Sequence, residues 1–474
     1  MTRPPPPDRT VISGFRKSKL LADFRLFIAS ESLHILFGFG SSIIAVRYFG
    51  TEVYGAQQFI LAMIAGWAIF NSVLDATASR FLGELPPSDQ APFAAGVVQA
   101  KGVCFVIIAG ITYFSAAFFE TSTLKAQELS QLLGMQSIVY CILVFGLLPI
   151  LNTSLSRVVG IKTKFQYQAT ADSAEHISRF IWLVFSTVGL QLDGQAALLL
   201  VLKGWFAIGI FAIIGKSIVL GSHSRPFFTS FCMGVVSRHG ISKVLSQKVR
   251  QYSGPMLASS LSGFIKEYLP LVVAASISNY ENVAWFRIVQ QIIRIGHQII
   301  PAAMDSIRPG IIDAKNRDLS VFEAKYRILS FLYLGIAWLL GVFFIIFAGS
   351  LMSVWSIEAN RTMVIVMTIL SLDLIFGAAL HIEYQIFMMG EKTWFLPLMS
   401  FLRQGVMALT MLVFSQRFGF TAIAASITFG TFAAWIGFTI YSALTNMRPR
   451  SHLWGTVAAA FFLACSIGLL GYLK

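Results

Sequence analysis

Charged residues are scarce in this chain of 474 residues, and their scarcity excludes an ordinary soluble protein. Asp, Glu, Lys and Arg make up 12% of the sequence, whereas a soluble domain is about one quarter charged. Hydrophobic residues make up 56%. Runs of roughly 20 apolar residues, the length that crosses a bilayer as a helix, recur along almost the whole chain. We therefore predict an all-α polytopic membrane protein.

Cysteine and the common catalytic motifs are also scarce or missing. The four cysteines have no paired spacing, and we interpret them as free thiols: Cys104, Cys141, Cys232 and Cys465. The chain has no G-x-x-x-x-G-K-[ST] loop for ATP, no HExxH motif and no nucleophile elbow with a partnered histidine. The predicted outer loops are too short for an external catalytic domain. We expect a protein that is not an enzyme, with no catalytic residues, no metal site and no cofactor.

The apolar runs predict about 12–13 transmembrane helices, arranged as two lobes of six helices around a central cavity, with one further run. Their approximate ranges are 24–48, 56–80, 94–118, 130–152, 169–190, 195–219, 254–277, 283–307, 327–349, 362–389, 395–416, 420–445 and 453–473.

The same pattern divides the chain into five parts. A flexible basic tail over 1–22 precedes an N-lobe over 23–220. A cytoplasmic linker over 221–252 mixes apolar and basic residues at helical spacing, which predicts an amphipathic helix on the inner leaflet. A C-lobe over 253–446 follows, and 447–474 holds the extra helix.

The distribution of basic residues predicts the orientation in the membrane. With the N-terminus in the cytoplasm, the outer loops hold little more than Lys125, Arg361 and Arg417, while most Lys and Arg lie inside. The net charge of +14 then reflects topology and attraction to an anionic inner leaflet. We expect no nucleic-acid partner, and the thirteenth run predicts that Lys474 lies outside.

Two turns in the two predicted lobes have similar sequences. "RYFGTEVYGAQQF" leads into the second helix and "ASISNYENVAWFRIV" into the eighth. Each has a glutamate followed three positions later by a small residue, Glu52 to Gly55 and Glu281 to Ala284. Equivalent positions in two halves are typical of transporters whose site lies between the halves.

A polar stripe follows one face of the predicted eighth helix. The stripe consists of Arg287, Gln291, Arg294, Gln298 and Asp305, at steps of four, three, four and seven residues, which superpose at 3.6 residues per turn. A charge in the membrane centre costs at least about 2.5 kcal/mol, so the stripe faces either acids of neighbouring helices or a hydrated, anion-attracting cavity. The number of donors favours the cavity.

Lys266 and Glu267 lie together in the otherwise apolar seventh helix. Pro270 removes the backbone donor that would reach the carbonyl of Lys266, which weakens the helix there. The two side chains are about 100° apart around the helix. We expect Lys266 to face the cavity, and Glu267 either to do so or to pair with Arg287 or Arg294.

Other charges in the predicted helices are each interpreted first as members of intramembrane pairs and second as ligand contacts. They are Glu31, Glu175, Arg179, Lys203, Asp373 and Arg403. Asp75 and Glu383, nearer the inner interface, are interpreted as structural. Glu31, Glu267 and Asp373 are candidates for coupling to protons or sodium, and Glu175 is a further candidate charge partner.

The sequence resembles a known family at four places. "VRYFGTEVYGAQQF" resembles the turn after the first helix of the polysaccharide-transport (Wzx-type) lipid-linked oligosaccharide flippases, a branch of the multidrug/oligosaccharidyl-lipid/polysaccharide exporter superfamily. "SSLSGFIKEYLPLVVAASISNYENVAWFRIV" is similar to the seventh and eighth helices of that family, "SIRPGI" to its proline motif, and "FMMGEKTW" to the turn after its tenth helix. Glu267 stands where the family often has Asp.

The resemblance implies a flippase that moves undecaprenyl-diphosphate-linked oligosaccharide repeat units to the outer leaflet of a bacterial inner membrane by alternating access. It assigns the cavity bases to Lys266, Arg287 and Arg294, with Arg179, Lys203 and Arg403 as further members. We expect a monomer, because two halves already make the cavity, and the expected partners are the lipid bilayer and the polysaccharide polymerase or export machinery. An ion-coupled MATE-like exporter of small molecules is the alternative, and a membrane-embedded polymerase or ligase a third.

Overall fold

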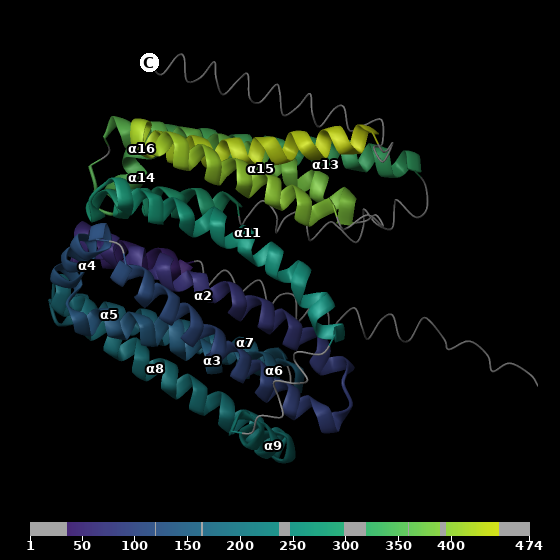
Figure 1. Cartoon of the computed structure of the whole chain (residues 1–474). Helices are drawn as coiled ribbons and strands as arrows, with labels where there is room; N and C mark the ends of the chain where they lie inside the picture. The colour runs from purple at the N-terminus through teal and green to yellow at the C-terminus, as the bar shows by residue number, and fades with distance from the viewer. Residues whose placement is uncertain are drawn as a thin grey trace, which may run out of the picture. The chain divides into compact units, whose positions relative to one another are not determined.

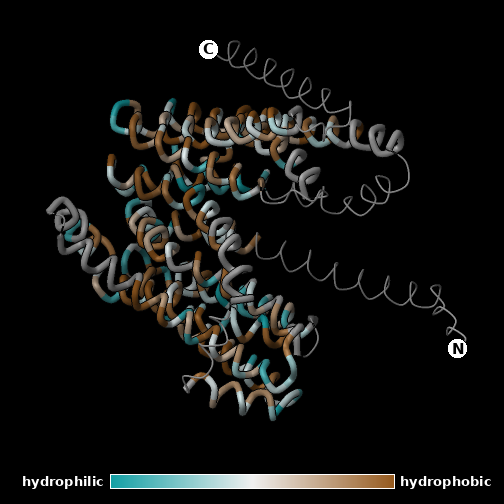
Figure 2. Tube along the Cα trace, turned by 45° about the vertical axis from the view of Figure 1, so that its right-hand side comes forward, coloured by the Kyte–Doolittle hydropathy of each residue, from teal (hydrophilic) through white to brown (hydrophobic). Residues whose placement is uncertain are grey.

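The computed structural model describes most of the chain, and all regular structure in these ranges is helical (Figure 1). The described residues are 36–118, 120–162, 165–236, 247–297, 319–358, 360–388 and 395–444. Hydrophobic residues occur along most described helices, with hydrophilic ones interspersed (Figure 2). The predicted all-α class is confirmed.

Six helices in the described part of the chain are long and apolar enough to cross a membrane. They are Pro87–Ile107, Met135–Val159, Gly194–His223, Ser260–Ile277, Arg361–His381 and Pro397–Tyr441, and Thr51–Gly66 with Ile69–Asp75 forms a seventh if this bent pair is one span. The predicted run 453–473 and parts of 24–48 and 283–307 lie outside the described residues.

Two glycines with positive φ mark helix boundaries, and one of them corrects a predicted helix. The expected helix over 130–152 is divided, because Gly134 has φ +70° and separates α4 (Glu120–Leu133) from α5 (Met135–Cys141). α16 runs over Phe395–Leu444, but Gly419, with φ +58° and ψ −137°, kinks it. Only glycine adopts such a conformation readily, so the two runs expected at 395–416 and 420–445 remain separate helical segments.

The chain forms two compact units. Unit 1 comprises 1–44, 70–124 and 135–253, and unit 2 comprises 45–69, 125–134 and 254–474. The C-terminal end of the first predicted helix and the N-terminal part of the second therefore belong to the unit that holds the C-terminal half, and α2 (Thr51–Glu84) contributes to both units.

In unit 1, α6 (Leu148–Lys162), α7 (Phe165–Val184) and α8 (Gly194–His223) pack against one another. α3 (Pro87–Phe118) packs against α6 and α9 (Arg225–Val236), and short π-helical turns at Ile142–Leu147 and Phe185–Gly189 follow α5 and α7. The side-chain amide of Gln99 donates to the carbonyls of Gly234 and Val235 at 3.1 and 2.8 Å, which fixes α9 on α3.

In unit 2, α15 (Arg361–Met388) packs against α13 (Leu319–Ile346) and α16. α11 (Gln247–Ile277) and the helical residues 280–297 supply the charged positions predicted from the sequence, and α14 (Ala348–Ser353) is a short connection. Phe395 stacks on Tyr441 with ring centroids 3.8 Å apart, so the two segments of α16 meet at their far ends.

The two similar turns contact each other inside unit 2. A Cβ atom added to Gly55 would lie 1.8 Å from the carbonyl oxygen of Tyr280 and 3.2 Å from the backbone nitrogen of Ala284. The Phe59 ring lies 5.9 Å from that of Tyr280. Small residues at both positions let the helix backbones approach this closely.

We expect Gly55→Ala to destabilise the folded protein by about 1–3 kcal/mol, because backbone must move to admit the methyl group. The matched control is Gly102→Ala, since nothing lies within 4 Å of a Cβ at Gly102. Alanine there should be neutral or stabilise by up to about 1 kcal/mol through its helix propensity. Thermal unfolding in detergent measures both, and equal effects would contradict the close approach.

Candidate functional site

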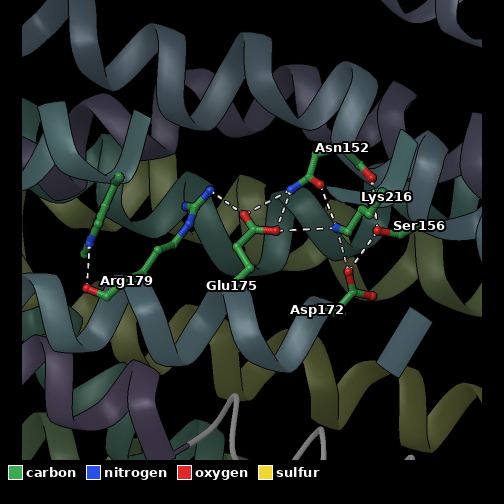
Figure 3. A network of polar contacts seen from close by, with 7 residues as sticks. Asn152, Ser156, Asp172, Glu175, Arg179 and Lys216 are labelled. Atoms are coloured by element: carbon green, nitrogen blue, oxygen red, sulfur yellow. Dashed lines mark hydrogen bonds and ion pairs between the residues drawn. The ribbon is translucent and has the colours of Figure 1, made fainter. Parts of the chain in front are cut away.

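A network of charged and amide side chains lies inside unit 1 (Figure 3). The Lys216 ammonium on α8 is 2.6 Å from Asn152 Oδ1, 2.8 Å from Asp172 Oδ1 and 3.4 Å from Glu175 Oε2. Asn152 donates to both oxygens of Glu175, and the Ser156 hydroxyl donates to Asp172 at 2.8 Å. An ammonium has three donors, so the buried Lys216 is fully satisfied.

Arg179, a predicted cavity base, belongs to the same network. Its Nη2 lies 2.7 Å from Glu175 Oε1, one helical turn away on α7. Its backbone carbonyl accepts a hydrogen bond from the Trp205 indole at 2.9 Å. Glu175 and Arg179 therefore form an ion pair one helical turn apart.

A second buried lysine in unit 1 is also satisfied. The Lys101 ammonium contacts Asp75 Oδ1 at 2.5 Å, Ser154 Oγ at 2.8 Å and Thr153 Oγ1 at 3.0 Å. The Lys101 side chain is completely buried. Asp75 thus has the ion partner that its structural interpretation requires.

In unit 2, four side chains surround the buried carboxylate of Asp373 on α15. His297 Nε2 lies 2.9 Å from Asp373 Oδ2, and the Thr431 hydroxyl contacts Oδ1. Arg403 Nη2 donates to Thr431 at 2.6 Å and lies 3.8 Å from Asp373 Oδ1. Lys266 also acts on this carboxylate electrostatically.

His297 reaches Asp373 because Gly377 on α15 has no side chain. A Cβ atom at Gly377 would lie 2.8 Å from His297 Cε1. This glycine is therefore required by a close approach.

A cavity of about 300 Å³ opens beside these residues and is lined by both basic and hydroxyl side chains. Lys266 and Ser262 from α11, His297, His381 from α15, and Ser400 and Arg403 from α16 supply its polar lining. Within the described part of the chain, Lys266 has neither a hydrogen-bond partner nor an ion pair. Unlike Lys101 and Lys216, it presents its ammonium donors to the cavity.

Glu267, the neighbour of Lys266, is paired with both arginines that the sequence left as alternatives. Its Oε1 contacts Arg294 Nη1 and lies 3.4 Å from Arg287 Nη2. The Arg287 guanidinium also lies 5.9 Å from the Tyr268 ring centroid. Arg287 is almost buried, whereas 49% of the Arg294 side chain is exposed.

The remaining predicted site residues do not belong to the charged clusters around Asp373 and Glu267. Gln291 donates to the hydroxyl of Tyr54 at 3.3 Å, which connects the polar stripe to α2. Lys203 is exposed on α8. Glu31, Gln298 and Asp305 lie outside the described residues, as does the side chain of Glu383.

The two units differ in the charge balance of these clusters. In unit 1, Lys101, Arg179 and Lys216 form ion pairs with Asp75, Asp172 and Glu175, and these paired charges balance. Arg157 acts on Lys101 as one further cation. In unit 2, Lys266, Arg287, Arg294 and Arg403 face only Glu267 and Asp373 among the described residues. The clusters of unit 2 thus carry an excess of two positive charges, and protonation of His297 would add another.

Sequence reasoning missed several of these residues. Lys101 and Lys216 are single lysines in apolar helices and share no periodic pattern with other polar residues. Thr431 carries no charge and gave no signal. His297 could have been found, because it lies three residues after Arg294 on the same helix.

The described residues offer no cluster of metal ligands. No group of three or more His, Cys, Asp or Glu side chains in this part of the chain could hold a metal ion.

We expect Lys216→Met to destabilise the protein by about 3–5 kcal/mol, because Asp172 and Glu175 lose a buried partner. Lys266→Met is the matched control, since it removes a lysine that satisfies no carboxylate directly, and it should be neutral or slightly stabilising. Thermal unfolding in detergent measures both. A loss of stability at Lys266 as large as that at Lys216 would make Lys266 a structural partner.

Known structures resemble this chain in fold, although its sequence matches no family model and no curated protein. The lipid II flippase MurJ in an inward closed conformation matches with a TM-score of 0.63 and 13% identity, covering 95% of this chain and 100% of that one.

Two structures of MATE family multidrug resistance transporters of the MOP superfamily also match. The inward-facing one has a TM-score of 0.63 and 14% identity, covering 91% of this chain and 96% of that one. The outward-facing one has a TM-score of 0.54 and 13% identity, covering 94% and 96%. The chain therefore has the fold that MurJ and the MATE transporters share.

Proposed function

We propose that this protein is a flippase for undecaprenyl-diphosphate-linked oligosaccharide repeat units, which it moves from the inner to the outer leaflet of a bacterial inner membrane. The observation that carries the proposal is the positive excess among the described residues of unit 2, above all the ammonium of Lys266, which lines the cavity without an ion pair in that part of the chain. The fold, shared with a lipid II flippase and with MATE transporters, supports a transporter of this superfamily.

The chemistry of a diphosphate diester suits this excess of charge. Such a group carries one negative charge on each phosphorus at neutral pH, and a cation acts strongly on an anion where the dielectric constant is low. One arginine guanidinium can bind two phosphate oxygens through two parallel hydrogen bonds, whereas lysine acts as a point charge. Lys266 and Arg403, which line the cavity, would attract the diphosphate together with the partly exposed Arg294, while Ser262 and Ser400 could bond to sugar hydroxyls.

A MATE-like exporter of organic cations is the competing function. A site for cations requires carboxylates that are free to face the ligand. Here Asp373 is already contacted by His297, Thr431 and Arg403, and Glu267 by two arginines. These contacts favour an anionic substrate.

The sequence is the basis for the proposed membrane orientation and oligomeric state. We propose that the N-terminus is cytoplasmic, because Lys and Arg concentrate in the segments that this orientation places inside. The chain would work as a monomer without a cofactor and deliver its product to the polysaccharide polymerase or export machinery.

We expect Arg294→Ala to lower the translocation rate by at least about tenfold, since a charge-assisted contact to phosphate is worth about 1.4 kcal/mol or more. The assay uses the purified chain in proteoliposomes with a fluorescent polyprenyl-diphosphate oligosaccharide, whose accessibility in each leaflet is measured over time. Arg417→Ala is the control, because Arg417 is exposed beside Phe418 and has no ion pair within the described residues. An unchanged rate in Arg294→Ala would remove Arg294 from the site.

The phenotype of cells that lack the protein distinguishes the flippase from the exporter of organic cations. Lipid-linked repeat units trapped on the inner face, with loss of surface polysaccharide, would support the flippase. Normal polysaccharide with increased sensitivity to toxic organic cations would establish the exporter instead.

A further inference from the structure

Glu267 forms ion pairs with Arg287 and Arg294, the two arginines that an anionic substrate would need to bind. Both arginines converge on the same carboxylate oxygen, Oε1, from the neighbouring helix over 280–297. The pair is partly open, because 30% of the Glu267 side chain and 49% of the Arg294 side chain are exposed. An incoming anion can therefore reach this ion pair.

The arginines retain unused donors. Arg287 Nε is buried and has no hydrogen-bond partner within the described residues. A guanidinium has five N–H donors, and a single carboxylate oxygen engages few of them. A diphosphate offers more acceptor oxygens and could bond to both guanidinium groups at once.

We propose that Glu267 is an internal counter-ion, which the diphosphate of the substrate displaces from Arg294 and Arg287 and which returns when the substrate leaves. The inference rests on the proposed function and assigns Glu267 a role in it. Glu267 is then a residue that sets the affinity for the anion and the rate of its release.

The physical reason is competition for the same cations. Arginines without a counter-ion would bind any phosphate tightly and release it slowly, whereas a covalently attached carboxylate is always present to take the place of a departing anion. Arg287 is held by burial and by the Tyr268 ring, so exchange centres on the more exposed Arg294.

The test is calorimetric binding of inorganic pyrophosphate to the purified full chain in detergent. Glu267→Gln should bind roughly fivefold more tightly than the original chain, the factor expected for losing one partly exposed charge pair. Glu267→Asp retains the charge and should bind within about twofold of the original. Glu358→Gln removes an exposed glutamate elsewhere in unit 2 and should change nothing.

Transport in proteoliposomes gives the second readout. Glu267→Gln should lower both the KM for the lipid-linked substrate and the maximal rate, because the substrate leaves more slowly. A merely structural role would lower the unfolding temperature of Glu267→Gln without tightening binding, so the unfolding temperature is measured on the same samples.

The outcomes separate this inference from the proposed function. Unchanged or weaker pyrophosphate binding in Glu267→Gln, or no pyrophosphate binding by the original chain, would overturn the counter-ion role even if lipid-linked oligosaccharide is flipped. Tighter binding in a protein that does not flip the lipid would support the counter-ion role and overturn the flippase. Tighter binding of free pyrophosphate with no effect on the lipid-linked substrate would assign the site to a soluble anion and overturn the displacement by substrate.

Discussion

A charge inside hydrocarbon needs an opposite charge or a polar partner nearby, and this requirement governs the polar residues of the chain. Unit 1 meets it completely at two lysines, since Lys101 and Lys216 each contact three oxygen acceptors. These clusters join helices through buried ion pairs. Among the described residues, the clusters of unit 2 hold more cations than carboxylates, and Lys266 lines a cavity without a direct ion pair. This excess is the basis of the proposed anionic substrate.

Close helix packing positions these charges. Gly377 makes room for His297 to reach Asp373, and Gly55 brings α2 against the backbone at Tyr280. The Tyr54 hydroxyl, next to Gly55, accepts a hydrogen bond from Gln291 on the polar stripe. The packing of unit 2 and its charged stripe are thus parts of one arrangement, in which small residues let polar side chains from several helices meet.

The sequence predicted the polar residues of unit 2 better than those of unit 1. Arg287, Gln291 and Arg294 repeat at helical spacing, and such a pattern marks one face of a helix whatever packs against it. Lys216 is a single charge on α8, and its three partners come from α6 and α7. No local pattern connects residues that are as many as 64 positions apart, as Asn152 and Lys216 are.

Composition alone determined that the chain is helical and crosses the membrane, because a backbone in hydrocarbon must satisfy its own hydrogen bonds. The order of residues also determined which helices carry charge. Only the tertiary structure decided which charges cancel: it paired Arg179 with Glu175 and Glu267 with two arginines, and it left Lys266 facing a cavity. The reason is that ion pairing depends on distances of a few ångströms between helices, which packing sets and periodicity within one helix does not.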